Sequence, residues 1–336
     1  MKKLLVPFVL ILVLVLSACG GKDNTANNAN SAAGNNAATE SNAAAEGNAA
    51  EGNATEGNAA ATETKTGTIT YQSETGPVEV PADPQRVVML SGFTGNVIKL
   101  GVPVVGADVW SKTNPTFTEE MKDVVEVSDE NLEKIIELNP DLIIGLSNIK
   151  NLDKLKEIAP VVTYTWGKLD YLQQHVEIGK LLNKEQEAQT WVDDFKSRVE
   201  QAGNEIRAKI GEDATVSVIE AWGKDLYVYG ANWARGTEIL YQGMKLKMPE
   251  KVKADALEAG YYTLSAEVLP DYMGDYVLLS KYSDADAAFQ QTEMYKNIPA
   301  VKNNHVFEMQ GEGASFSDPV TLEKQFEFIK KSFLGN

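Results

Sequence analysis

Cysteine and histidine are scarce in this chain of 336 residues. Its single cysteine is Cys19, and its two histidines are His175 and His305. One cysteine excludes a disulfide framework and a cysteine-based zinc site. Two isolated histidines suggest neither a catalytic triad nor a set of imidazole ligands for a bare transition metal. The chain also lacks a Gly-x-Gly-x-x-Gly motif and a P-loop. We therefore expect no catalytic site and no metal site, and we predict that the protein is not an enzyme.

Basic residues and long apolar runs are also in short supply. The chain has 31 Lys and Arg against 48 Asp and Glu, which gives a formal net charge of −17. Nucleic-acid binding needs clustered Lys and Arg, so the composition argues against a nucleic-acid partner. Beyond the N-terminus, no segment has the roughly 18 consecutive apolar residues that a membrane-spanning helix needs.

The N-terminus contains a targeting signal. It begins MKKLLVPFVLILVLVLSACGG, in which two lysines precede an apolar stretch, as is typical of a signal peptide. The segment Leu16-Ser17-Ala18-Cys19 resembles the lipobox of bacterial lipoproteins. That resemblance implies removal of residues 1–18, lipidation of Cys19 and anchoring to the extracytoplasmic face of the cell membrane.

The next segment has almost no apolar residue larger than alanine. It contains the repeat EGNAA EGNAT EGNAA at 46–60. Such a composition cannot bury enough surface to form a core. We therefore predict that residues 19–66 are a lipidated cysteine followed by a disordered tether.

From residue 67 on, strand and helix signals alternate. Continuous apolar runs such as Val87–Leu90 and Leu142–Leu146 are typical of strands buried on both faces of a parallel sheet. Residues 171–182 and 185–210 contain no strand signal and no proline, and predict two helices. We expect an α/β fold with two Rossmann-like lobes and a ligand cleft between them. The N-terminal lobe spans 67–168, the interlobe helix 169–184 and the C-terminal lobe 185–336.

The residues that follow each predicted strand are candidates for ligand contact, because open α/β sheets bind ligands there. In YVYGANWARGTEILYQ (227–242), a turn contains Trp233 and Arg235, neither of which a turn requires. Tryptophan supplies apolar area, and arginine supplies a rigid fork of donors. A structural alternative is that Trp233 caps the sheet and Arg235 pairs with a surface carboxylate. Other candidates at strand ends are Trp110, Trp166, Lys281 and Phe316.

Three stretches resemble the iron-siderophore substrate-binding lipoproteins of ABC importers, and most of all their ferric-hydroxamate branch. They are VPADPQRVVMLSG (80–92), NLEKIIELNPDLIIG (131–145) and YGANWARGTEILYQGMKLK (229–247). The Asn-Trp-x-Arg-Gly turn is the specific part, whereas the second stretch also marks cobalamin and haem receptors.

The resemblance implies a fold of the class III periplasmic-binding-protein type, with two lobes joined by one long helix. It implies that Trp233 and Arg235 contact the siderophore. Tyr227 matches an aromatic residue just upstream of the turn, and Trp166 falls where the most similar relatives have an aromatic residue in the cleft. Phe316 lies in the C-terminal cleft segment.

The resemblance also implies partners. Glu133 and Glu267, one in each lobe, match an acidic pair that meets arginines of the permease. The alternative is that each simply complements a helix dipole. The expected partners are a ferric siderophore, an ABC permease with its ATPase, and the membrane through the lipid. We expect a monomer.

The chemistry of the ligand fits the scarcity of metal ligands. A ferric hydroxamate siderophore already fills all six iron positions, so the iron is held by the siderophore and no cofactor is expected. A triscatecholate complex is trianionic and favours several basic groups, whereas this cleft offers Arg235 and Lys281. The sequence therefore favours a hydroxamate ligand, with a catecholate siderophore, cobalamin or haem as alternatives on the same fold.

Overall fold

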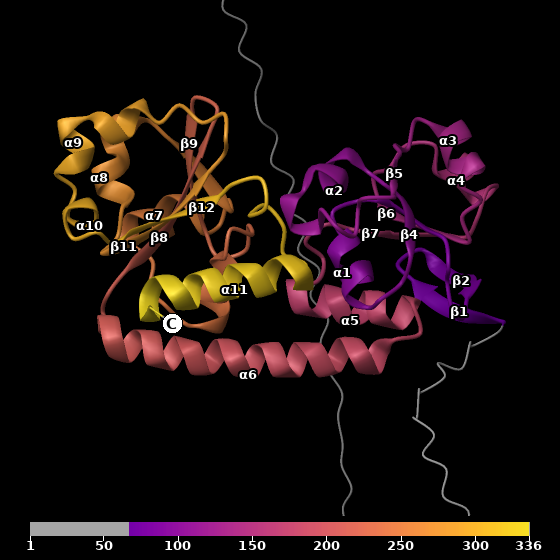
Figure 1. Cartoon of the computed structure of the whole chain (residues 1–336). Helices are drawn as coiled ribbons and strands as arrows, with labels where there is room; N and C mark the ends of the chain where they lie inside the picture. Colours follow the sequence, from indigo (N-terminus) through magenta and orange to yellow (C-terminus); the bar gives the residue numbers. More distant parts are fainter. Residues whose placement is uncertain (1–66, 336) are drawn as a thin grey trace, which may run out of the picture. The chain divides into compact units, whose positions relative to one another are not determined.

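The computed structural model describes residues 67–335, which fall within one compact unit (Figure 1). The predicted signal peptide, Cys19 and the tether lie outside these residues. The described part starts with an antiparallel hairpin of β1 (Thr68–Ser73) and β2 (Gly76–Pro81). No helix between residues 67 and 335 combines the length and the apolarity needed to cross a membrane.

The first lobe contains a five-stranded parallel sheet with the order β5-β4-β3-β6-β7. Its strands are β3 (Val87–Leu90), β4 (Val104–Ala107), β5 (Val125–Glu126), β6 (Leu142–Leu146) and β7 (Val161–Tyr164). Its helices are α1 (Thr94–Lys99), α2 (Val109–Thr113), the 3-10 helix η1 (Pro115–Phe117), α3 (Leu132–Glu137) and α4 (Leu152–Lys156).

Both faces of this sheet are buried, which explains the continuous apolar runs of its strands. In β3, Val87 and Met89 pack into one core, and Val88 and Leu90 pack into another on the opposite face. Successive side chains of a strand point to opposite faces, so both sets must be apolar when helices cover both sides.

The second lobe contains a mixed five-stranded sheet with the order β10-β9-β8-β11-β12. Its strands are β8 (Val216–Trp222), β9 (Asp225–Tyr229), β10 (Tyr261–Leu264), β11 (Tyr276–Lys281) and β12 (Val306–Gln310). Strand β11 pairs in parallel with β8 and β12, whereas β9 is antiparallel to β8 and β10. Its helices are the π-helix η2 (Glu238–Gly243), α7 (Glu250–Ala256), η3 (Ala266–Val268), α8 (Leu269–Tyr272), η4 (Ala288–Gln291), α9 (Glu293–Lys296), α10 (Pro299–Lys302) and α11 (Pro319–Leu334).

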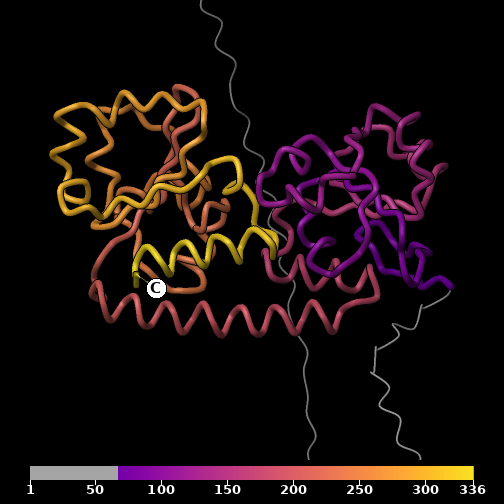
Figure 2. The backbone as a smooth tube through the Cα atoms, viewed as in Figure 1, coloured from indigo at the N-terminus to yellow at the C-terminus, as the bar shows by residue number. Residues whose placement is uncertain are grey.

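Two helices, α5 (Tyr171–Leu181) and α6 (Glu185–Ile210), connect the lobes, as the chain trace in Figure 2 shows. Each contributes to both cores. In α6, Ala188 packs with the first lobe, and Phe195 packs with the second. With 26 residues, α6 is about 39 Å long at 1.5 Å per residue. The expected interlobe segment, 169–184, contains α5 but ends before α6, which has residues in both lobes.

The C-terminal helix α11 also braces the two lobes. The Lys324 Nζ donates to the Thr116 carbonyl of the first lobe at 2.8 Å. At the start of α11, Asp318 lies against Gly95 of α1 so closely that a Cβ on Gly95 would come within 1.8 Å of the carboxylate. Glycine is therefore required at this crossing, and the lobes are held together by side chains as well as by the connecting helices.

Candidate ligand-binding site

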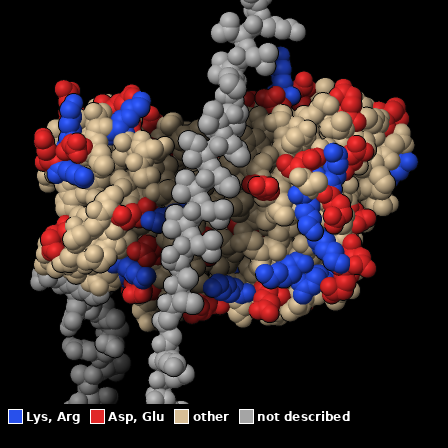
Figure 3. Space-filling model, turned by 180° about the vertical axis from the view of Figure 1, so that it is seen from behind, with Lys and Arg blue, Asp and Glu red and all other residues tan. Residues whose placement is uncertain are grey.

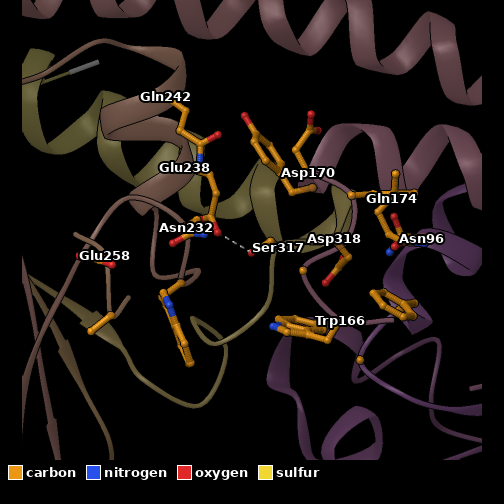
Figure 4. Close-up of a pocket in the computed structure, with 17 residues that line it drawn as sticks. Asn96, Trp166, Asp170, Gln174, Asn232, Glu238, Gln242, Glu258, Ser317 and Asp318 are labelled. Atoms are coloured by element: carbon orange, nitrogen blue, oxygen red, sulfur yellow. Dashed lines mark hydrogen bonds between the residues drawn. The ribbon is translucent and has the colours of Figure 1, made fainter. Parts of the chain in front are cut away.

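A cavity of about 500 Å³ lies between the two lobes, and its lining is drawn in Figure 4. This volume is within the usual range for small-molecule sites, roughly 300–1,000 Å³. The first lobe and α5 contribute Gly92, Phe93, Asn96, Trp166, Gly167, Leu169, Asp170, Tyr171 and Gln174. The second lobe contributes Asn232, Trp233, Glu238, Gln242, Glu258, Ala259, Ser317 and Asp318.

Two tryptophans, one from each lobe, present apolar surface to this cavity. Trp166 follows β7, is 60% exposed, and stacks on Phe93 at a centroid distance of 5.9 Å. Trp233 follows β9, is 37% exposed, and meets Tyr261 edge-on at 5.1 Å. Exposed tryptophans held by neighbouring rings provide fixed flat surfaces for the apolar parts of a ligand.

The turn that contains Trp233 has an uncommon backbone. Ala234, Arg235 and Gly236 all have positive φ, at 59°, 55° and 85°. Two successive non-glycine residues in the left-handed region are strained, and such strain persists only where the surroundings hold it.

Hydrogen bonds from beyond the turn hold it in place. Trp233 N donates to Thr237 Oγ1 at 3.0 Å, and Ala234 N donates to Glu238 Oε1 at 2.9 Å. Arg235 N donates to the Ala314 carbonyl at 2.7 Å. The first turn of η2 and the segment before α11 thus fix the position of Trp233.

The Arg235 side chain is held by a buried carboxylate. Its Nε donates to Glu220 Oε2 at 2.7 Å and its Nη2 donates to Oε1 at 3.0 Å. Tyr229 and Ser280 donate to the same carboxylate at 2.7 and 2.9 Å. The guanidinium also lies 4.4 Å from the centre of the Tyr229 ring. Arg235 therefore pairs with a fully buried glutamate of β8, and it is not among the residues that line the cavity.

The other strand-end candidates lie outside the lining of this cavity. Phe316 is buried against Phe117 and behind Gly92. Tyr227 packs edge-on against Tyr261. Trp110 is exposed on α2, and the Lys281 Nζ pairs with Glu308 Oε2 at 2.6 Å.

Residues at the start of α5 complete the cavity, and the sequence prediction omitted them. Asp170 is the N-cap of α5, and its Oδ1 accepts from Leu172 N and Gln173 N. Tyr171 and Gln174 lie in the following turn. This segment does not follow a strand, and its one sequence signal is Asp170 as the N-cap of the predicted helix.

Two of the four carboxylates in the lining are buried and hydrogen-bonded within the protein. Glu238 Oε1 accepts from Ser317 Oγ at 3.0 Å as well as from Ala234 N. Asp318 is the N-cap of α11 and accepts from Val320 N and Thr321 N. Burial raises the pKa of Asp318 to about 6, against the lowering effect of its hydrogen bonds from Thr321 and Val320. Burial also raises the pKa of Glu238.

Behind the lining, His175 is completely buried, and its Nδ1 lies 3.1 Å from Asn96 Oδ1. Burial lowers the pKa of His175 to about 4, with a further contribution from the positive charge of Lys99. At neutral pH the imidazole is uncharged, and its Nδ1–H donates to Asn96. Within residues 67–335, no group of three or more His, Cys, Asp or Glu side chains is placed to hold a metal ion.

The two acids expected to meet a permease are exposed and lie outside the cavity lining. Glu133 is in the first turn of α3, and Glu267 is in η3. A hydrogen bond from Ser265, followed by one from its own backbone N–H, lowers the pKa of Glu267. Acidic and basic side chains are interspersed over the face of the described residues seen in Figure 3.

Residues 87–312 match the family described as periplasmic binding protein. Over 332 residues the chain is 36% identical to the iron(3+)-hydroxamate-binding protein FhuD of Bacillus subtilis (strain 168), covering 97% of this chain and 95% of that one. It is 32% identical over 340 residues to the iron(3+)-hydroxamate-binding protein YxeB of the same organism, covering 98% and 96%.

Solved structures resemble it as well. The structure of FhuD2 from Staphylococcus aureus with bound ferrioxamine B has a TM-score of 0.70 at 30% identity, covering 75% of this chain and 99% of that one. The FhuD protein from S. pseudintermedius has the same TM-score at 32% identity, covering 81% and 99%.

Proposed function

Because the chain belongs to the periplasmic binding protein family, we propose that it captures a ferric hydroxamate siderophore and delivers it to an ABC importer. The observation that carries this proposal is the match, over nearly the full length of each chain, to two iron(3+)-hydroxamate-binding proteins. The protein binds and hands over its ligand unchanged, and the siderophore itself coordinates the iron.

The cavity supports a hydroxamate over a catecholate ligand. Three hydroxamate anions neutralise Fe³⁺, whereas a triscatecholate complex keeps three negative charges. The lining contains Asp170, Glu238, Glu258 and Asp318, and no Lys, Arg or His is among its residues. A trianion in this cavity is repelled by these carboxylates, and the flanking cations Arg235 and Lys281 are already paired with Glu220 and Glu308.

We propose that Trp166 and Trp233 contact the apolar arms of the siderophore from opposite lobes. Arg235 donates to Glu220 and to the Trp233 carbonyl, and its remaining N–H groups serve hydroxamate oxygens at the edge of the site. We propose that four residues outside the cavity lining also contact the ligand: Tyr227, Phe316, Trp110 and Lys281.

Delivery requires an anchor and a docking surface. We propose that Cys19 bears the lipid that holds the monomeric protein on the extracytoplasmic face of the membrane. Glu133 and Glu267 are proposed to engage the permease, whose associated ATPase powers uptake. Both carboxylates are exposed and belong to different lobes, so a permease can contact the receptor at two points.

Tryptophan fluorescence tests the proposed ligand class. The protein is titrated with ferric hydroxamates, ferric catecholates, ferric citrate, haem and cobalamin, and quenching of Trp166 and Trp233 reports occupancy. We expect saturable quenching by ferric hydroxamates at the lowest concentrations. Tighter binding of a catecholate or cobalamin, or a Soret shift on adding haem, would show that this compound, and not a hydroxamate, is the ligand.

A further inference from the structure

The charged side chains in the lining of the cavity are all acidic. One carboxylate is at the N-cap of α5 and three are in the second lobe, and no basic side chain belongs to the lining (Figure 4). The two buried carboxylates, Glu238 and Asp318, accept hydrogen bonds from groups within the protein. The other two, Asp170 and Glu258, are exposed to whatever the cavity holds.

Asp170 and Glu258 are exposed, and neither forms an ion pair between residues 67 and 335. Asp170 uses Oδ1 to cap α5, at 2.9 Å from Leu172 N and 2.8 Å from Gln173 N, and no ion pair in the described part of the chain neutralises it. Lys168, the cation closest to it in sequence, pairs with Glu74 Oε2 at 3.3 Å. Glu258 follows α7 and has no hydrogen-bond or ion-pair partner in the described part of the chain.

A separate observation indicates where ligand oxygens lie. Gln174 lines the cavity although it is only 7% exposed, and its side-chain Nε2 has no hydrogen-bond partner among the described residues. Leaving a buried donor unpaired is costly, so a ligand that supplies an oxygen to Gln174 gains affinity. Hydroxamate and amide carbonyl oxygens are suitable acceptors.

We propose that this site selects ferric hydroxamates that have a free, protonated amine over neutral ones. This inference rests on the proposed function and adds the charge of the preferred ligand. The Gln174 amide receives an oxygen of the ligand, while the field of Asp170 and Glu258 favours a cationic group elsewhere in the same cavity. In hydrated surroundings, each carboxylate a few ångströms from the cation raises affinity about threefold to tenfold.

A pair of ligands that differ in a single charge tests this preference. Ferrioxamine B is a ferric trihydroxamate that ends in a primary amine, and N-acetylation of that amine removes the charge and leaves the iron centre intact. Affinities of the full-length chain in detergent are measured by tryptophan quenching in low and high salt. We expect ferrioxamine B to bind about 10 times more tightly than its acetylated form in low salt, with a smaller ratio in high salt.

Two double variants assign the effect to the cavity. Asp170→Asn/Glu258→Gln should reduce the ratio to nearly one, and Asn retains the N-cap of α5. The control Asp153→Asn/Glu200→Gln removes the same two charges from exposed positions on α4 and α6 outside the lining, and should retain the full ratio.

The outcomes separate this inference from the proposed function. If both ligands bind wild type equally, the charge preference is wrong and the proposed function stands. A preference that persists in the cavity variant arises from the bulk of the acetyl group, and that result also overturns the inference. If neither ferric hydroxamate binds, both proposals fail.

Discussion

Arg235 has an observed role in the fold and a proposed role in binding. Its partner Glu220 is completely buried and accepts hydrogen bonds from Arg235, Tyr229 and Ser280. Removing one member of a buried ion pair leaves the other charge out of water without compensation. The sequence singled out Arg235, but nothing in it linked this turn residue to a glutamate on strand β8.

We predict that Arg235→Ala lowers the free energy of unfolding by about 3–5 kcal/mol, because Glu220 loses its counter-charge. Arg235→Lys keeps the charge but loses the fork and should cost less. Urea unfolding measures both, and ligand titration of the folded Lys variant then isolates the contribution to binding. An Arg235→Ala protein as stable as wild type would show that Glu220 is satisfied without the arginine.

We predict that the free energy of unfolding depends on pH through the carboxyl group of Asp318. Burial raises its pKa from 3.8 to about 6, so between these values the folded protein keeps a proton that the unfolded chain releases. Its ionisation therefore costs stability as pH rises from 4 to 6, reaching about 2–3 kcal/mol at pH 7.

In Asp318→Asn the cap remains and this titration is absent. Relative to wild type, the variant should thus become more stable as pH rises from 4.5 to 7, as measured by urea unfolding. Asp170→Asn, which alters the exposed cap of α5, is the matched control. A constant difference between Asp318→Asn and wild type across this range would contradict the prediction.

Among the elements, the parallel strands were predictable and the antiparallel edge was not. Strand β3 is a continuous apolar run because helices cover both faces of its sheet. Strand β10 has three exposed residues and one buried residue, so its sequence lacks a strong strand pattern. Its pairing with β9 depends on a return of the chain through α7 that no local signal indicates.

The contact between α1 and α11 can be tested by adding a methyl group at Gly95. A Cβ at position 95 would come within 1.8 Å of Asp318, at the N-cap of α11. We predict that Gly95→Ala forces the two helices apart and lowers the unfolding free energy by at least about 2 kcal/mol, consistent with overpacking. Gly92→Ala is the control, because its Cβ would lie 3.8 Å from the Phe316 ring. Equal stability of the two variants in thermal melts would show that the crossing accommodates a methyl group.

For the whole molecule, the proposed function places capture and delivery on different surfaces. The cavity lies between the lobes, and Glu133 and Glu267 lie outside its lining. The sequence predicted both lobes and the two tryptophans of the cavity. It could not predict the acidic lining, because Asp170, at the start of α5, and Glu258, after α7, come to line one cavity only after folding.

We predict that Glu133→Ala/Glu267→Ala binds ferric hydroxamate like wild type and supports little iron uptake in cells. Charges at the rim of an interface act mainly on encounter and orientation and are sensitive to salt. Asp153→Ala/Glu250→Ala, which alters two other exposed first-turn acids, should retain uptake. Normal uptake by the first variant at equal protein levels would exclude the docking role. Weaker binding in solution would place these carboxylates at the ligand site.

The bracing of the lobes by α6 and α11 affects how empty and loaded receptors compete for a permease. The Lys324 side chain of α11 is hydrogen-bonded to the first lobe, and α6 has residues in both cores. We expect a receptor held in this way to present nearly the same outer surface whether it is empty or loaded. If the proposed docking holds, empty receptors occupy permeases as readily as loaded ones. Overproducing the receptor when siderophore is scarce should slow iron import rather than speed it.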